Sequence, residues 1–167
     1  QQTATHFFNR AIGIGLEIGT AVSEARGLIK LPPSEKAPLL FVERLLGTNV
    51  GLRSSTSPDW RLLKGHQYGP SVKAHLLYGA EGLAKAGFGL IAAVGKGSRD
   101  EPCFLKLHYR PKNKSEGTKK LSLIGKGVIL DTGGLSLKTD GQMTKMHYDM
   151  AGAATVASVF RLAVETN

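Results

Sequence analysis

The chain has 167 residues, enough for one domain that buries roughly 70% of the surface of its unfolded chain. A hydrophobic content of 41% and a charged fraction of 21% are typical of a soluble globular protein. The longest uncharged apolar stretches, residues 11–16 and 86–95, are far shorter than the ~20 residues that a bilayer-spanning helix needs. The single cysteine, Cys103, excludes an internal disulfide and a cysteine-based zinc cluster.

The formal net charge of +9 is compatible with an anionic partner, because basic surfaces attract phosphate groups. The basic residues are scattered, apart from one run of Arg110, Lys112, Lys114, Lys119 and Lys120. Proline, asparagine, serine and glycine interrupt this run, which favours a solvated loop between strands. The charge therefore leaves nucleic acid or a membrane surface open as a partner.

The first element that we expect is a helix over residues 5–30. Its apolar residues recur at a helical period, at Phe8, Ile12, Leu16, Ala21, Ala25 and Leu28. A proline-containing turn follows at residues 31–34, and Pro38 is a plausible first residue of a second helix.

The middle of the chain predicts short elements. Residues 48–53 are a candidate strand, and the Gly- and Pro-punctuated residues 54–73 are expected to be a loop or an insertion. Residues 74–86 are predicted to be a short helix. Residues 104–109 alternate apolar and polar side chains, as a half-exposed strand does.

Residues 121–155 are the stretch with a chemical signature. The β-branched run at residues 128–130 predicts a buried strand that ends at Asp131, and residues 121–124 form its partner or its first half. Residues 149–163 predict a helix with Asp149 near its positive end. The carboxylates of Asp131 and Asp149 are therefore expected to converge with the lysines Lys126 and Lys138 at one edge of a sheet.

Two segments within this stretch, GKGVILDTGGLSLK and DMAGAAT, resemble the leucyl aminopeptidase (cytosol aminopeptidase) family. These enzymes are metallopeptidases with two metal ions that remove N-terminal residues from peptides. The order and the spacing both agree with the family: Asp131 follows Lys126 by five residues and precedes Lys138 by seven and Asp149 by eighteen. Residues 87–98 also resemble the family, and this resemblance implies a strand and a turn there.

The resemblance implies a role for each residue. Asp131 bridges two divalent ions, zinc or manganese with magnesium as a further option, and Lys126 and Asp149 complete the more tightly held ion. Lys138 is the catalytic residue that polarises the scissile carbonyl, and Met146 lines the pocket for the first side chain of the peptide. Together these five residues form the expected substrate-binding set.

The chemistry explains why these residue types are useful. Two dications about 3.5–4 Å apart clamp the attacking and leaving groups of a hydrolysis, and carboxylates are suited to bridging them. A lysine binds a metal only as its neutral amine, whereas Lys138 would stay charged and act as a fixed electrophile.

The family's further element, Asp-Ala-Glu-Gly-Arg, supplies more metal ligands and a catalytic arginine, and no Asp-x-Glu-x-Arg is present in this sequence. We therefore expect the chain to be inactive as a peptidase by itself. In one hypothesis, the remaining ligands lie on residues outside this sequence or on a second chain. In the other, the chain is a non-catalytic scaffold subunit of a larger protein or ribonucleoprotein assembly, which would need no metal.

The expected fold class is α/β, a mixed β-sheet flanked by helices. Residues 1–33 would be a linker helix region, and residues 34–167 the N-terminal part of an aminopeptidase-like catalytic domain. By resemblance, the protein is a homohexamer, and a partner chain is expected to complete the fold. The expected location is cytoplasmic, with the mitochondrial matrix as an alternative.

Overall fold

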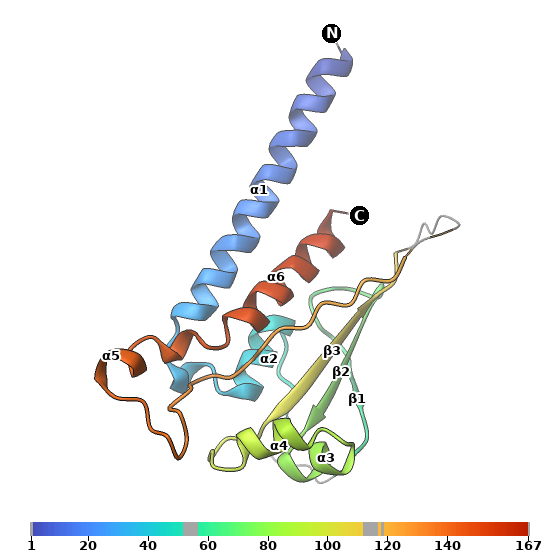
Figure 1. Ribbon diagram of the computed structural model, residues 1–167. Helices are drawn as coiled ribbons and strands as arrows, with labels where there is room; N and C mark the ends of the chain where they lie inside the picture. Colours follow the sequence, from blue (N-terminus) through green and yellow to red (C-terminus); the bar gives the residue numbers. More distant parts are fainter. Residues whose placement is uncertain (1, 52–56, 112–116, 118, 167) are drawn as a thin grey trace. The chain divides into compact units, whose positions relative to one another are not determined.

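The computed structural model describes residues 2–51, 57–111, 117 and 119–166. The chain forms two compact units. We call residues 1–32 with 117–167 the helical unit and residues 33–116 the sheet unit, and each is described by itself (Figure 1).

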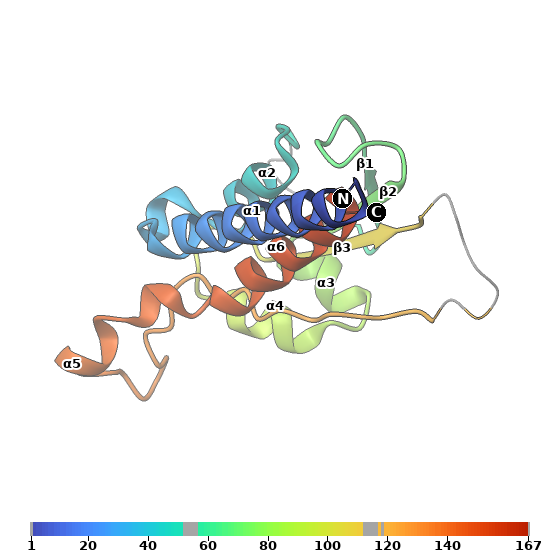
Figure 2. The same ribbon diagram turned by 90° about the horizontal axis from the view of Figure 1, so that it is seen from above.

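The helical unit is built on a pair of helices. Helix α1 (Gln2–Lys30) and helix α6 (Ala151–Glu165) lie side by side in both views (Figures 1 and 2). The side chains buried along this pair are small: Ala21 and Ala25 on α1, and Ala154, Ala157 and Ser158 on α6. Because small side chains let two helix backbones approach closely, these residues explain why the two helices pair along this face.

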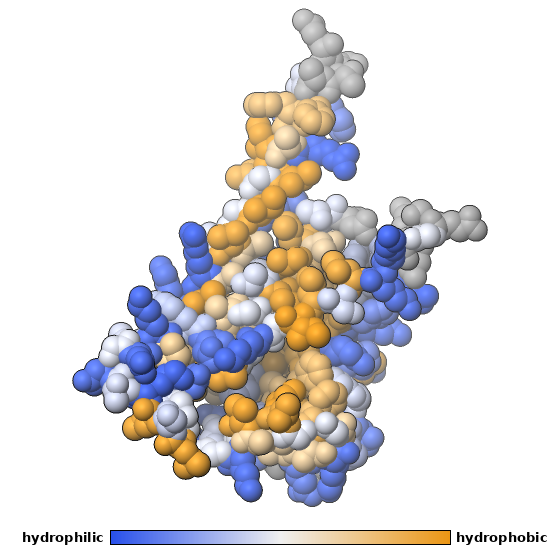
Figure 3. Space-filling view, viewed as in Figure 1, coloured by the Kyte–Doolittle hydropathy of each residue, from blue (hydrophilic) through white to orange (hydrophobic). Residues whose placement is uncertain are grey.

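Two short helices precede α6 in the helical unit, α5 (Asp140–Met143) and the 3-10 helix η2 (Met146–Tyr148). The helix predicted over residues 5–30 is confirmed, and so is the helix predicted over 149–163, which begins two residues later. Not all of the predicted apolar face of α1 is covered, however: Ala21 and Ala25 are buried, whereas Phe8 and Leu16 are 64% and 68% exposed. Figure 3 shows this apolar surface along α1.

The sheet unit contains a three-stranded antiparallel sheet in the order β1-β2-β3. Strand β2 (Val72–Tyr78) is central, and β1 (Arg61–Leu63) and β3 (Cys103–Tyr109) pair with its two edges. The helices of this unit are η1 (Pro33–Glu35), α2 (Pro38–Leu46), α3 (Ala80–Lys85) and α4 (Gly89–Gly95).

The two faces of the sheet differ. On one face, the β2 side chains Val72, Ala74 and Leu76 are buried, and α2, which contacts β3, buries its own apolar side chains Phe41, Val42, Leu45 and Leu46. On the opposite face, Lys73, Lys106 and His108 are exposed. Leu77, at the α3 end of that face, packs in a cluster with Leu83 and Ala92, which Trp60, Phe88 and Phe104 border.

The α/β class is confirmed, with helices around a sheet that is antiparallel throughout the described residues. The strand predicted at 104–109 is confirmed as β3, and a helix does begin at Pro38. The described members of the basic run, Arg110, Lys119 and Lys120, lie outside helices and strands, as a loop requires; Lys112 and Lys114 lie outside the described residues.

Some of the sequence predictions are wrong. Residues 74–78 continue strand β2, and the helix begins only at Ala80, after a turn that Gly79 makes with a φ of 94°. Pairing with β3 overrides the helix preference of this Ala- and Leu-containing segment. Residues 87–98 contain helix α4 in place of a strand, because Gly87, at a φ of 88°, ends α3 and lets α4 fold back on it.

Two further corrections concern loops. Residues 48–51 form no strand, since Gly51 N–H bonds the Asn49 side chain at 2.7 Å and closes a turn; residues 52 and 53 are not described. The segment 54–73, of which 54–56 are not described, is not one loop, because it contains β1 and the start of β2.

The strands predicted at 121–124 and 128–130 are also absent. The residues between and after these two runs bond to the turn before α6 and to the first turn of α6 instead: Lys126 O accepts from Ala153 N–H at 2.8 Å, and Asp131 N–H approaches Met146 O at 3.5 Å. Among the described residues, no helix combines the length and the apolar character that crossing a bilayer requires.

Candidate functional site

All five predicted site residues lie in the helical unit, within or beside the connections that lead to α6. Lys126 and Asp131 belong to an irregular segment, and Lys138 lies just before α5. Met146 opens η2, and Asp149 caps the end of the same short helix. The structure groups these residues as two ion pairs.

Asp131 and Lys138 form the first pair. Lys138 Nζ lies 2.7 Å from Asp131 Oδ2, and Asp131 Oδ1 accepts the N–H of Gly133 at 2.9 Å. Lys138 N–H also donates to Thr132 O at 2.9 Å, which closes the turn. The hydrogen bond from Lys138, followed by that from Gly133 N–H, holds the pKa of the Asp131 carboxyl below its usual range. Asp131 is therefore a carboxylate at neutral pH.

Lys126 and Asp149 form the second pair, with Nζ 2.6 Å from Oδ2. The Asp149 side chain is 20% exposed and that of Lys126 58% exposed. Asp149 Oδ2 is fully buried, and no donor among the described residues is aligned to give it a hydrogen bond. The Lys126 amine is thus within ion-pair distance of Asp149 Oδ2 but is not aligned for a hydrogen bond. The lone pairs of this buried oxygen therefore remain available to a cation or a hydrogen-bond donor.

Met146 joins the two pairs through its backbone. Its carbonyl oxygen accepts from Asp149 N–H at 3.3 Å and, more weakly, from Asp131 N–H at 3.5 Å. Its side chain is half-buried. The two carboxylate-bearing residues are therefore held near one oxygen atom even though eighteen positions separate them in the sequence.

Sequence reasoning missed two glycines that make this arrangement fit. Gly125 precedes Lys126, and Gly152 lies in the first turn of α6, where the two backbones meet at close range. Their positions in the sequence could have indicated this role, because Gly125 lies next to Lys126 in the GKG segment and Gly152 follows Asp149 in the DMAG segment. Glycine is favoured where one backbone approaches another closely.

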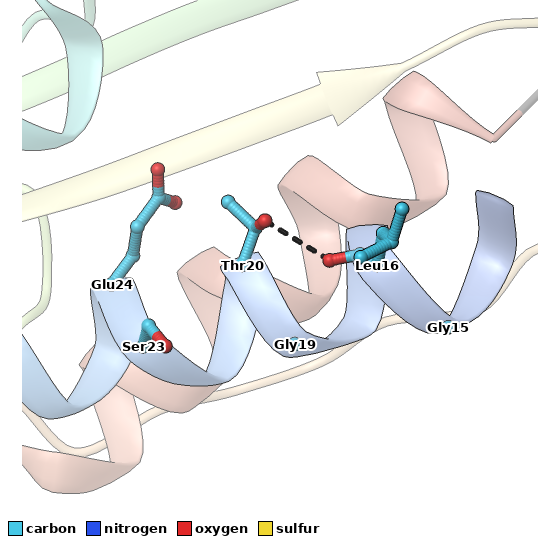
Figure 4. Close-up of a pocket in the computed structure, with 6 residues that line it drawn as sticks. All are labelled: Gly15, Leu16, Gly19, Thr20, Ser23 and Glu24. Carbon is cyan, nitrogen blue, oxygen red and sulfur yellow. Dashed lines mark hydrogen bonds between the residues drawn. The ribbon is translucent and has the colours of Figure 1, made fainter. Parts of the chain in front are cut away.

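The described residues contain no group of three His, Cys, Asp or Glu side chains that could hold a metal. A metal centre at this site would therefore need the lysine amine as a ligand beside the two carboxylates. A separate hollow on α1, lined by Gly15, Leu16, Gly19, Thr20, Ser23 and Glu24, contains none of the predicted site residues (Figure 4). Its Thr20 hydroxyl donates to Leu16 O in the same helix at 3.0 Å.

The chain is similar to known aminopeptidases along most of its length. The model of the cytosol aminopeptidase family, catalytic domain, matches residues 24–167. Probable cytosol aminopeptidases of Rhodococcus erythropolis and Mycobacterium ulcerans are 35% and 33% identical over 89% and 90% of this chain. The chain spans 25% and 26% of the length of these two relatives.

Solved structures agree. The bottromycin maturation enzyme BotP in complex with Mn matches with a TM-score of 0.73 and 31% identity, over 94% of this chain and 29% of that one. Leucyl aminopeptidase from Leishmania major in complex with actinonin matches with a TM-score of 0.74 and 30% identity, over 89% of this chain and 24% of that one. The chain therefore belongs to the cytosol aminopeptidase family and corresponds to part of its catalytic domain.

Proposed function

We propose that this chain supplies part of the active site of a two-metal, leucyl-type aminopeptidase, a hydrolase that removes N-terminal residues from peptides. The observation that carries the proposal is the buried Oδ2 of Asp149, which lies 2.6 Å from the Lys126 amine and accepts no aligned hydrogen bond within the described residues. A buried carboxylate oxygen with spare lone pairs beside an amine is a suitable start for a cation site.

The donor set fits divalent ions in part. Lys126, Asp131 and Asp149 would hold them, with Asp131 shared between two. Zinc and manganese suit a mixed nitrogen and carboxylate set, and magnesium suits the carboxylates; BotP, one of the structural neighbours, is a complex with Mn. When bound, the ions supply Lewis acidity at the scissile carbonyl.

The remaining roles belong to the chain's own side chains. Lys138, now paired with Asp131, would direct its ammonium to the carbonyl of the peptide and stabilise the negative charge that develops there. Met146 would contact the first side chain of the substrate, since it is half-buried and adjoins both carboxylate-bearing residues. Substrate would thus meet all five residues of the set.

The rest of the active site would come from residues outside this sequence or from a partner chain, and we propose a homohexamer as the assembled form. In this proposal, residues 1–33 are a linker helix region and residues 34–167 the N-terminal part of the catalytic domain. The proposed location is the cytoplasm, in keeping with the cytosol aminopeptidases among the relatives, with the mitochondrial matrix as the alternative.

Calorimetric titration of the purified chain with MnCl₂ and with ZnCl₂ tests the site. We expect saturable binding that Asp149→Asn and Asp131→Asn each weaken at least tenfold. Asp140→Asn is the matched control, because Asp140 is exposed at the start of α5 and lies outside the site. Absence of binding for both metals, or equal binding by all three variants, contradicts the proposal. We expect no release of leucine from leucine amide by the chain alone.

One observation favours a second candidate function, a scaffold subunit without catalysis. Helix α1 exposes large apolar side chains, among them Phe7 at 76%, Phe8 at 64% and Leu16 at 68% (Figure 3). Contiguous apolar surface of this kind marks contact with another protein. Co-purification of the native protein in stoichiometric amounts with unrelated proteins, together with absence of metal, would favour the scaffold over the peptidase.

A further inference from the structure

The exposed face of the sheet in the sheet unit carries a row of lysine and histidine side chains. Pairing in the sheet sets Lys73 directly opposite His108 and His75 directly opposite Lys106. Side chains of residues that pair directly share one face, so all four project from the same side of β2 and β3. Lys73, Lys106 and His108 are exposed, and His75 is half-buried between them.

This row continues at the end of β1. Lys64 follows β1 directly, and together with His66 and Lys73 it lines a hollow beside Gly65 and Gly69. We call Lys64, His66, Lys73, His75, Lys106 and His108 the basic face. No ion pair within the described residues involves its three lysines.

The sequence around the basic face offers no compensating charge. Neither residues 60–80 nor residues 102–115 contain an aspartate or glutamate. Lysines that share one face of a sheet without a carboxylate partner repel one another, so this arrangement costs folding free energy. Burial, followed by the charges of Lys106, Lys73 and His108, lowers the pKa of His75.

Two buried nitrogen atoms in this row also lack a partner. Nδ1 of His66 and Nδ1 of His75 are buried and make no hydrogen bond within the described part of the chain. Buried polar atoms are normally paired, so an unpaired one calls for an explanation. A ligand that supplies anionic oxygens next to the lysines would account for the uncompensated charge.

Aromatic rings border the cations. Lys106 Nζ lies 4.5 Å from the centre of the Trp60 ring, which packs edge-on against Phe104 and Phe88. The imidazoles of His75 and His108 stand in the same two strands. Cations interleaved with flat rings are the combination that proteins use to hold single-stranded nucleic acid, where lysines meet phosphates and rings stack on bases.

We propose that the basic face binds single-stranded nucleic acid through its phosphates. This function is separate from the proposed peptidase site, because every residue involved lies in the sheet unit and none of the five site residues does. The lysines contact phosphate oxygens without reading sequence, so the affinity depends strongly on salt.

Fluorescence anisotropy with the full chain and a fluorescein-labelled 20-nucleotide single-stranded RNA of mixed sequence tests this. At 50 mM salt, we expect Lys64→Glu/Lys73→Glu to raise Kd at least tenfold and to flatten the dependence of log Kd on log salt. Lys73→Glu/Lys106→Glu should act in the same way. The control Lys96→Glu/Arg99→Glu makes the same change of charge in the same unit, outside the basic face, and should change Kd less than threefold.

Trp60 provides a second readout, because it is the sole tryptophan of the sequence and lies beneath Lys106. Bound RNA should change its emission in the wild-type chain and in the control variant, but not in Lys64→Glu/Lys73→Glu. If the basic-face and control variants weakened RNA binding equally, the proposal would be overturned. Full displacement of the RNA by polyglutamate of matched charge would also overturn it, because that result would identify an acidic protein segment as the ligand. Tighter binding of a duplex of the same sequence would overturn the single-stranded assignment.

Discussion

Gly125 lies so close to Ala153 that a β-carbon built on it would stand 2.6 Å from Ala153 Cα and 2.6 Å from Gly152 O. The hydrogen bond from Ala153 N–H to Lys126 O, 2.8 Å long, fixes this approach. The first turn of α6, which follows Asp149, therefore packs directly against the backbone of Gly125 and Lys126. The geometry of the Lys126–Asp149 pair depends on a glycine that carries no chemistry of its own.

Gly125→Ala should therefore destabilise the helical unit and separate Lys126 from Asp149. A methyl group that meets backbone atoms at this distance forces a backbone shift, and overpacking of this kind costs about 1–3 kcal/mol. We expect a fall in Tm of several degrees and weaker binding of Mn²⁺, measured by calorimetry of unfolding and of metal titration.

Gly127→Ala is the control for this prediction. Gly127 lies two residues further along the same segment, and its added β-carbon would meet only Ala153 Cβ at 3.5 Å, an ordinary contact. Equal effects of the two substitutions would mean that close approach at Gly125 does not hold the site together.

The sequence predicted helices α1 and α6 and strand β3 better than it predicted the backbone that carries Lys126 and Asp131. Periodicity located α1 and α6, and alternation located β3, because these elements expose one side and bury the other. The strand expected before Asp131 is absent, since a short β-branched run cannot show whether a partner strand is available to it. The turn at Gly79 and the pairing of β2 with β3 join residues far apart in sequence, and no local pattern reports such pairing.

Gly133 shapes the turn that brings Lys138 to Asp131. It has a φ of 90°, and a β-carbon there would lie 2.2 Å from Ser136 O. Gly133→Ala should therefore both strain the backbone and break the contact between Asp131 and the Gly133 N–H. Gly134→Ala meets open space at a φ of 67° and should cost only about 1–2 kcal/mol. Urea unfolding of both variants measures the difference, and an equal loss of stability would contradict the steric argument.

Cys103 should be almost unreactive in the folded chain. Burial raises the pKa of its thiol to about 12, and the sulfur lies 3.7 Å from Pro38 O. Because the thiolate is the reactive form, labelling by a disulfide reagent at pH 8 should be far slower than in the unfolded chain. A labelling rate in buffer equal to that in 6 M guanidinium would contradict this.

The same thiol implies a dependence of stability on pH. Its pKa in the folded state is above its ordinary value, so the folded state keeps its proton longer than the unfolded state does. The contribution of Cys103 is therefore complete below about pH 8.5, the ordinary thiol value, and is lost progressively as the pH rises toward 12. Cys103→Ala should remove this part of the alkaline loss of stability, which urea unfolding between pH 8 and 10.5 would detect.

Arg161 links the helix pair of the helical unit. Its Nη1 contacts Glu24 of α1, and its Nε donates to Glu165 one turn further along α6 at 2.6 Å. The Arg161 and Glu24 side chains are 28% and 38% exposed, so solvent screens part of the attraction. A double-mutant cycle with Glu24→Gln and Arg161→Gln should therefore give a coupling free energy of about 0.5–1 kcal/mol, which falls as salt is raised. The corresponding cycle with Glu165→Gln should give about 0.3–0.5 kcal/mol, the usual value for a pair within one helix. A smaller coupling for Glu24 than for Glu165 would mean that this ion pair does not stabilise the contact between α1 and α6.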